Sequence, residues 1–347
     1  MTSALQLENL TIAFGRGRNR VVAVQGVDLR VEPGEVVGLV GESGSGKSTI
    51  ARAVVGLVQP AAGRVLVAGH NIRNSRRGRI SRSELASLAQ MVFQDPYSSL
   101  DPRMSVARTI DEALRYGRRG LSRAERQREV MRLLETVTLD GAYADRMPSQ
   151  LSGGQRQRVA IARSLAVRPK LLIADEVTAA LDVSVQAQIL NLLRTIQRAE
   201  GLSMLFISHN LSMVRYLSDR IAVMYMGEIV EVGPSEELVR SPTHPYTKVL
   251  LAAVPKLAGD EVDEMWLPVG ETADPRHPPQ GCRFHPRCPV GPGIRSGREL
   301  CQTLDPREDA SLRPHSAACH FPLKSDEPAP ARAATHFDRA DLSRRKS

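Results

Sequence analysis

The chain has 347 residues, enough for one large domain with an appendage or for two domains. Its formal net charge of +9 suits a phosphate-rich partner, but it does not choose among nucleotide, nucleic acid and an anionic membrane surface. The longest apolar runs fall far short of the roughly 20 residues of a membrane-spanning helix, and the N-terminus lacks a signal-peptide pattern. We therefore expect a cytoplasmic chain, in which disulfides are disfavoured.

From the N-terminus to about residue 255, short β-branched runs alternate with amphipathic stretches, which predicts an α/β fold with a largely parallel sheet. Residues 36–40 (VVGLV) form a strand candidate that leads into a glycine-rich turn and a helical pattern over 47–57. Two more buried strands are predicted at 171–174 and 204–208. Each ends beside polar side chains, as functional strands in such sheets usually do.

Between residues 96 and 166 the strand signal disappears, and charged helical patterns such as LSRAERQREVMRLLETV replace it. This change predicts a helical subdomain inserted into the α/β core.

The sequence GESGSGKST, Gly41–Thr49, matches the phosphate-loop pattern GxxxxGK[ST] and lies between a predicted strand and a predicted helix. Its glycines let backbone N–H groups wrap around phosphates at a helix N-terminus. Lys47 would reach the β and γ phosphates, Ser48 would hold Mg²⁺ and Thr49 would contact the α phosphate. An ordinary glycine-rich turn is the alternative, which the strand and helix on either side disfavour. The other residues expected to bind ATP are Gly41, Ser43, Gly44, Ser45 and Gly46.

A second glycine motif, LSGGQRQRVAIAR from Leu151, precedes LLIADE by about twenty residues, and nearly the whole chain resembles the ATP-binding subunits of ABC transporters. By itself LSGGQ could simply be a helix N-cap at Ser152. The resemblance implies a parallel-sheet core with an antiparallel β subdomain. It also implies that the LSGGQ signature faces ATP bound by a partner subunit, with contacts from Ser152, Gly153, Gly154 and Gln155.

The resemblance also assigns the catalytic roles. Asp175 would order the Mg²⁺ water shell and Glu176 would act as general base, although two acids after a strand could also be a solvated turn. His209 would contact the γ phosphate beside Lys47, although a lone histidine is more often structural. Gln94 would contact Mg²⁺ and the attacking water, so that Mg²⁺ is held through Ser48, Gln94 and Asp175.

Two further residues follow from the same resemblance. Asp182 would communicate across the ATPase dimer, and Phe14 would stack on adenine unless it is simply a core aromatic. The chain departs from the family pattern at Val177, where proline is usual and would restrict the turn after Glu176. We expect this loop to be somewhat more mobile than usual.

FQDPYSSLDPRMSV and SPTHPYTKVLLAAVP resemble the ATPase subunits of oligopeptide and dipeptide importers, a group that includes nickel and other small-solute systems. Structurally, Pro245 would begin a helix that packs Val249, Leu250 and Val254 on the core. The resemblance implies ATP hydrolysis that energises peptide uptake at the cytoplasmic face of the membrane. Its partners would be two permease subunits, a second ATPase subunit in a heterodimer or homodimer, and indirectly an extracytoplasmic binding protein.

Two alternatives stay open. The solute could be nickel or another small molecule, because the ATPase subunit does not select it. A soluble ABC ATPase that acts on ribosomes or nucleic acid would suit the basic charge. Such proteins usually carry two tandem cassettes, whereas this chain has one phosphate loop, so no nucleic-acid partner is expected.

All four cysteines lie in the last 66 residues, at Cys282, Cys288, Cys301 and Cys319. Residues 256–325 are rich in Pro, Gly, Arg and His, which predicts a small irregular domain, and 326–347 read as a disordered tail. Buried free thiols and disulfides are possible, but metal ligation explains the clustering better, and the spacing leaves zinc and iron–sulfur open.

The GCRFHPRCP stretch and the later ACHFP resemble the C-terminal region of peptide-importer ATPases, some of which hold a 4Fe-4S cluster. The resemblance therefore implies such a cluster at the four cysteines, with Zn²⁺ as the alternative. His285, His315 and His320 are reserve ligands, which we expect to lie around the site or at the surface rather than on the metal. We expect a structural or regulatory staple that lies remote from ATP.

Overall fold

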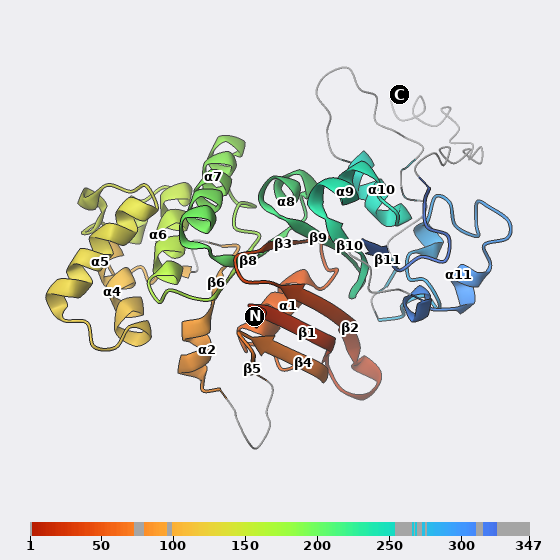
Figure 1. Cartoon of the computed structure of the whole chain (residues 1–347), viewed down its shortest axis with the longest axis horizontal. Helices are drawn as coiled ribbons and strands as arrows, with labels where there is room; N and C mark the ends of the chain where they lie inside the picture. Colours follow the sequence, from red (N-terminus) through yellow and green to blue (C-terminus); the bar gives the residue numbers. More distant parts are fainter. Residues whose placement is uncertain are drawn as a thin grey trace, which may run out of the picture.

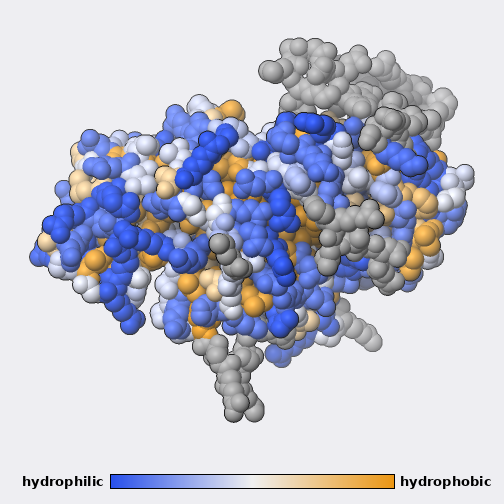
Figure 2. Space-filling model, in the orientation of Figure 1, coloured by the Kyte–Doolittle hydropathy of each residue, from blue (hydrophilic) through white to orange (hydrophobic). Residues whose placement is uncertain are grey.

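The computed structural model describes residues 2–72, 80–95, 99–253, 266, 268, 273–274, 276–309 and 315–324. The predicted tail at 326–347 and Val254 lie outside the described residues. Two sheets and the helices around them form the body of the molecule, with the C-terminal segment at one end and helices α4 and α5 at the other (Figure 1). Hydrophilic side chains cover most of the face in view, and hydrophobic ones gather in small patches (Figure 2).

The smaller sheet is antiparallel throughout. In spatial order its strands are β2 (Val21–Val31), β1 (Leu5–Phe14), β4 (Ala62–Val67) and β5 (His70–Asn71). The first of these strands in the sequence, LQLENLTIAF, alternates apolar and polar residues, so one face is buried and the other meets solvent.

The larger sheet is mixed. In spatial order its strands are β11 (Ser316–Ala317), β10 (Glu228–Pro234), β9 (Arg220–Tyr225), β3 (Val36–Val40), β8 (Ser203–Ser208), β7 (Leu171–Asp175) and β6 (Ala89–Val92). Strands β9, β3, β8, β7 and β6 run parallel to one another, while β10 pairs antiparallel with β9 and β11 pairs antiparallel with β10. Three of the central strands, β3, β8 and β7, are buried along their whole length, as expected of a parallel sheet covered on both faces. The three strands predicted from the sequence are therefore present.

Helices cover both faces of the larger sheet. The helices of the described residues are α1 (Lys47–Val54), α2 (Arg82–Leu88), α4 (Val106–Gly117), α5 (Arg123–Thr136), α6 (Gly153–Leu165), α7 (Val183–Glu200), α8 (Leu211–Leu217), α9 (Ser235–Arg240), α10 (Pro245–Ala252) and α11 (Leu300–Thr303). Short 3-10 helices lie at η1 (Gly17–Asn19), η2 (Gly141–Tyr143), η3 (Pro148–Gln150), η5 (His285–Arg287) and η6 (Pro306–Asp309). None of the helices in the described ranges is both long and apolar enough to cross a membrane.

Local sequence explains several helix boundaries. Capping boxes start α2 at Ser81 and α5 at Ser122. In each, the serine hydroxyl accepts the backbone N–H of a glutamate three residues later, and the side chain of that glutamate accepts the backbone N–H of the serine. The first helix ends three residues earlier than the predicted 47–57, since Gly56 takes a φ of +76° that breaks the helical pattern.

The alternation of side chains along the central strands creates two apolar cores. Val37 and Leu39 of β3 face a core shared with α1 and the antiparallel sheet, so this helix lies between the two sheets. Val36 and Val40 face the opposite core, which is built with α4 to α8. The carboxyl end of β3 therefore meets α1 directly, and this junction is the phosphate loop.

The C-terminal segment is attached to the larger sheet. Strand β11 pairs with β10 through Glu231 with Ala317 and Val232 with Ser316. Just before α10 begins, the Thr243 carbonyl accepts the Leu323 N–H at 2.8 Å. The irregular segment predicted from composition thus extends the main sheet by one short strand.

Candidate functional site

The phosphate loop follows β3 and turns into α1 at Lys47. Gly46 caps the helix with a φ of +106°, and a Cβ added there would lie 2.5 Å from the Ala23 carbonyl oxygen. A Cβ on Gly41 would lie 2.1 Å from the Met224 carbonyl oxygen. Only glycine fits both positions, so these glycines are required by close backbone packing as well as by the loop's curvature. The first backbone N–H groups of α1 have no partner within the helix and are available to an anion.

Lys47 is buried and folds back over the loop. Its Nζ donates to the carbonyl oxygens of Gly41 at 2.8 Å and Glu42 at 2.7 Å, and lies 3.3 Å from the Ser45 Oγ. Burial lowers the pKa of Lys47, and the carboxylates of Glu176, Asp175 and Glu42 oppose the shift. The ammonium group is therefore placed among the loop oxygens, where it can meet a phosphate.

Two of the predicted Mg²⁺ ligands lie together. The Ser48 Oγ, one residue into α1, donates to the Asp175 Oδ1 at the end of β7 over 3.0 Å. Burial raises the pKa of Asp175, and the bond from Ser48 opposes that shift. A hydroxyl beside a carboxylate fits a magnesium ion that takes its remaining ligands from phosphate and water. Gln94, the third predicted ligand, bonds elsewhere.

Gln94, Glu176 and His209 form one constellation at the carboxyl ends of three neighbouring strands. The Gln94 Nε2 donates to Glu176 Oε2 at 3.1 Å, and the His209 Nδ1 lies 3.5 Å from Glu176 Oε1. Glu176 has a φ of +47°, uncommon for a residue with a side chain, and its backbone N–H donates to the Ile207 carbonyl at 3.0 Å. The strained turn after β7 aims this carboxylate at residues from β6 and β8, where strain often marks a functional site.

The loop after Glu176 was expected to be more mobile than usual because Val177 replaces a proline, and the packing of Val177 bears on this expectation. Its side chain is 2% exposed and packs in the core built with α4 to α8. The next residue, Thr178, is also buried. The valine that stands in place of the usual proline thus anchors the turn through packing.

The signature residues form the start of α6. Ser152 caps the helix by accepting the Gln155 N–H at 3.3 Å, while Gln155 accepts the Ser152 N–H at 2.9 Å. A Cβ on Gly154 would lie 2.6 Å from Val185 at the start of α7, so glycine permits close packing there. In the described part of the chain, no hydrogen bond or ion pair joins Ser152–Gln155 to the phosphate loop.

The predicted dimer and adenine contacts are exposed. Asp182 occupies the N-cap position of α7 without a side-chain capping bond and lies on the surface beside Val183, which is 82% exposed. Phe14 ends β1 with 46% of its surface exposed, so it is not the core aromatic that the alternative required. Exposed apolar side chains at strand and helix ends are available for a ligand or a partner chain.

The C-terminal segment was expected to lie remote from ATP, and the structure corrects this. The Arg287 Nη1 donates to the Glu42 Oε2 at 2.8 Å, and Glu42 belongs to the phosphate loop. Tyr246 of α10 accepts the Glu42 backbone N–H through its hydroxyl at 2.9 Å. Sequence reasoning missed Glu42, Tyr246 and Arg287. The sequence signal that could have pointed to Arg287 is that two arginines lie between Cys282 and Cys288.

The four cysteines are free thiols that line one small cavity. Burial raises the pKa of three of them, Cys282, Cys288 and Cys319, to about 12. Among the residues that the structure describes, no group of three or more His, Cys, Asp or Glu side chains is placed to hold a single metal ion.

Of the reserve ligands, only His285 lines the cavity. His315 is bound to Glu231, with its Nε2 2.7 Å from the carboxylate, and to Glu237 at 3.2 Å. His320 lies 2.9 Å from the Leu304 carbonyl through its Nε2. His315 and His320 are thus engaged in other contacts.

Comparisons with known families match two parts of the chain. Residues 24–179 match the ABC transporter family, and residues 230–292 match the C-terminal region of oligopeptide/dipeptide transporters. The first match covers the phosphate loop, Gln94, the signature and Glu176. The second covers α10 and the segment from Cys282 to Cys288.

Individual proteins agree with these matches. The chain is 49% identical to the oligopeptide transport ATP-binding protein OppF of Bacillus subtilis over 251 residues, 72% of this chain and 82% of that one. It is 41% identical to the di/tripeptide transport ATP-binding protein DppF of Pseudomonas aeruginosa over 305 residues, 88% and 91% of the two chains. The ATP-binding cassette MJ0796, solved as a dimer in a post-hydrolysis state with ADP and Pi, is 30% identical with a TM-score of 0.60. That match covers 67% of this chain and 98% of that chain.

Proposed function

Because this chain belongs to the ATP-binding subunits of oligopeptide/dipeptide ABC importers and is an ABC transporter ATPase, we propose how its residues perform ATP hydrolysis. Lys47 and the N–H groups at the start of α1 hold the β and γ phosphates, with Gly41, Ser43, Gly44, Ser45, Gly46 and Thr49 completing the loop. Ser48 and Asp175, which lie 3.0 Å apart, hold Mg²⁺ together with phosphate oxygens and water. Phe14 stacks on adenine. When bound, Mg²⁺ supplies positive charge that offsets charge developing on the phosphates.

Glu176 is the proposed general base, and its contacts with Gln94 and His209 are the observation that carries this role. The carboxylate accepts a proton from the attacking water, Gln94 orients that water, and His209 donates to the γ phosphate. Hydrolysis then depends mainly on positioning and on electrostatic stabilisation of the transferring phosphoryl group.

The test is Glu176→Gln, which keeps the shape and removes the base. Purified complex with this variant should retain bound ATP and release phosphate about 10² to 10⁴ times more slowly than the unaltered complex. Glu135→Gln, at an exposed position on α5, is the control and should turn over normally. Unchanged phosphate release in Glu176→Gln would remove Glu176 as the base.

The proposed partner is a second ATPase subunit. Ser152, Gly153, Gly154 and Gln155 would contact ATP held by that subunit, and Asp182 would transmit the contact across the dimer. Support comes from the exposure of Asp182 and Val183 at the start of α7 and from the dimeric structure of the similar cassette MJ0796. We propose a heterodimer with a related ATPase rather than a homodimer. Sizing of the isolated chain with the Glu176→Gln substitution and ATP separates the two, because a homodimer would form without any other protein.

The membrane subunits would dock in a groove beside Gln94. This groove is lined by the end of α1, by α2 and β6, and by α4 and α6, including Leu57, Phe93 and Tyr116. Leu57 is 64% and Tyr116 is 74% exposed, which suits an apolar element from another subunit. We propose that the chain lies at the cytoplasmic face of the membrane, with two permease subunits and indirectly an extracytoplasmic binding protein as its partners. Tyr116→Ala should reduce co-purification with the permease subunits while leaving ATP binding intact.

We further propose that residues 1–255 form the ATPase unit, with a helical subdomain at about 96–166. Residues 256–325 would form a C-terminal unit with a 4Fe-4S cluster at Cys282, Cys288, Cys301 and Cys319. The support is that all four thiols line one cavity, walled in part by Phe284 and Val290, and four thiolates are the donor set of such a cluster. Bound there, the cluster would supply folding free energy.

Metal and sulfide analysis of anaerobically prepared protein tests the cluster. Four iron atoms with four sulfides per chain, lost in Cys288→Ser, would support it. Iron-free protein with stoichiometric zinc would replace the cluster with a zinc site.

A further inference from the structure

The short stretch between Cys282 and Cys288 contacts the phosphate loop. Arg287 is 7% exposed, and its Nη1 donates to Glu42 Oε2 at 2.8 Å. The backbone of Glu42 is held as well, since its N–H donates to the Tyr246 hydroxyl at 2.9 Å and its carbonyl accepts Lys47 Nζ at 2.7 Å. A continuous chain of polar contacts thus runs from Arg287 to the lysine of the phosphate loop.

An aromatic cluster fixes Arg287 and Tyr246 in place. The Phe284 ring lies 5.2 Å from each of the rings of Tyr225 and Tyr246, which are themselves 4.7 Å apart. All three side chains are at most 1% exposed. The Arg287 guanidinium reaches this cluster, since its Nη1 donates to the Tyr225 hydroxyl at 3.4 Å.

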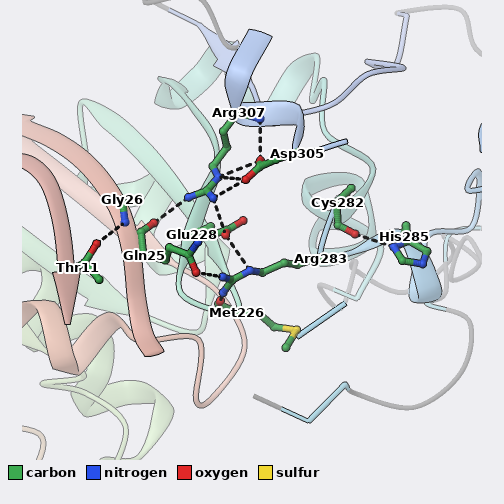
Figure 3. A network of polar contacts seen from close by, with 10 residues as sticks. All are labelled: Thr11, Gln25, Gly26, Met226, Glu228, Cys282, Arg283, His285, Asp305 and Arg307. Carbon is green, nitrogen blue, oxygen red and sulfur yellow. Dashed lines mark hydrogen bonds and ion pairs between the residues drawn. The ribbon is translucent and has the colours of Figure 1, made fainter. Parts of the chain in front are cut away.

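Arg283, the other arginine between Cys282 and Cys288, connects to the phosphate loop through a buried polar network (Figure 3). Its Nε is 2.7 Å from Glu228 Oε1, and its other nitrogens donate to the Met226 carbonyl and to Gln25. The turn that carries Met226 is bound to the phosphate loop, because the Gly227 N–H donates to the Ser45 carbonyl at 2.9 Å.

Further contacts hold this network in place. Arg307 lies 3.1 Å from Glu228 and donates to the Gln25 carbonyl at 2.9 Å, while Asp305 accepts from Arg307 (Figure 3). Residues from β2, β10 and the C-terminal segment therefore meet around one buried carboxylate. The C-terminal segment touches the phosphate loop at Glu42 directly and at Ser45 through one turn.

We propose that residues 282–288 brace the phosphate loop within the same chain, and that Arg287 is a positioning residue for ATP binding through Glu42. The proposal rests on the assignment of Gly41–Thr49 as the ATP site. Bringing a polyphosphate next to the Glu42 carboxylate is unfavourable unless that charge is neutralised, and Arg287 neutralises it at hydrogen-bond distance. The brace uses the residues between the two cysteines and requires nothing bound to the thiols.

The test is a double-mutant cycle between Arg287 and Glu42, read as the Kd for Mg·ATP of the full-length chain with a fluorescent ATP analogue. Arg287→Gln leaves the carboxylate unneutralised and should weaken binding about tenfold. Introduced together with Glu42→Gln, the same substitution should change Kd less than about threefold, because no charge remains to neutralise. Arg287→Lys should recover most of the affinity. Arg276→Gln, at an exposed arginine of the same region, should bind as the unaltered chain does.

The outcomes separate this proposal from the ATP-site assignment. If Lys47→Ala does not weaken binding, the ATP site is misplaced. If Lys47→Ala abolishes binding but Arg287→Gln binds like Arg276→Gln, the brace is wrong. The brace is also wrong if Arg287→Gln changes the Kd for Mg·ATP by the same factor in the unaltered chain and in the Glu42→Gln variant. Arg287 would then act through some group other than the Glu42 carboxylate. Should Arg287→Gln fail to fold, Arg287→Met, which keeps the side-chain length and also removes the charge, gives the same cycle with and without Glu42→Gln.

Discussion

His244 is buried and neutral, and this predicts that the protein loses stability as the pH falls from 6.5 towards 4. Its side chain is 1% exposed, and its Nδ1 accepts the Tyr246 N–H at 3.0 Å at the start of α10. Burial lowers the pKa of His244 from 6.5 to about 4, while the nearby Glu231 opposes the shift. A ring nitrogen that accepts a hydrogen bond cannot also carry a proton, so the contact agrees with the direction of the shift.

The sign follows from proton binding in the two states. Between pH 6.5 and about 4 the unfolded chain protonates this histidine and the folded chain does not, so the free energy of unfolding falls as the pH falls. Each pH unit within this window is worth about 1.4 kcal/mol, so the full effect of His244 is about 3 kcal/mol. Above pH 6.5 the stabilisation is complete, and the residue contributes no further pH dependence.

The substitution that isolates this effect is His244→Asn. Asparagine can still accept the Tyr246 N–H as an N-cap, but it does not titrate. Urea unfolding of both proteins between pH 4 and 7.5 would give the difference in free energy of unfolding at each pH. The difference should shrink by about 3 kcal/mol towards pH 4, since groups common to both proteins cancel. A difference that stays constant across this range would refute the neutral, buried state of His244.

Three other substitutions have definite expected outcomes. Phe14→Ala should weaken ATP binding by about tenfold through the loss of stacking, while leaving the unfolding midpoint unchanged because the ring is 46% exposed. Phe284→Ala should cost about 3 to 5 kcal/mol, followed by the fluorescence of the single tryptophan, Trp266; a loss below about 1 kcal/mol would contradict the packing. Gly46→Ala should destabilise the fold by about 1 to 3 kcal/mol more than Gly120→Ala, which shares a φ near +100° but has open space for the methyl group. Equal urea midpoints for the two glycine variants would mean that the clash at Gly46 is relieved by a small shift.

Local sequence was a good guide to the elements that carry the site. Residues 36–40, 171–174 and 204–208 read as buried strands because a parallel sheet covered on both faces buries every residue of a strand. The glycines of the phosphate loop could be predicted because no other residue permits their backbone geometry. The meeting of Gln94, Glu176 and His209 could also be predicted, because each follows the carboxyl end of a neighbouring parallel strand.

Contacts between distant segments could not be predicted in this way. Arg287 and Glu42 are 245 residues apart, and each looks like a solvated charge within its own sequence. Arg283 likewise meets its partner Glu228 of β10 only when the C-terminal segment folds back onto the main sheet. Periodicity reports which face of an element is buried, but it does not report which charge a buried arginine will meet.

The position of β3 has a consequence for synthesis on the ribosome. This strand is made early, yet its two neighbours in the sheet are β8 at residues 203–208 and β9 at residues 220–225. The phosphate loop at its end therefore stays without its native surroundings until more than half of the chain has been translated. Its contact with Arg287 comes later still. A nascent chain of this protein should acquire nucleotide binding late, because a loop that is translated early is completed by segments translated much later.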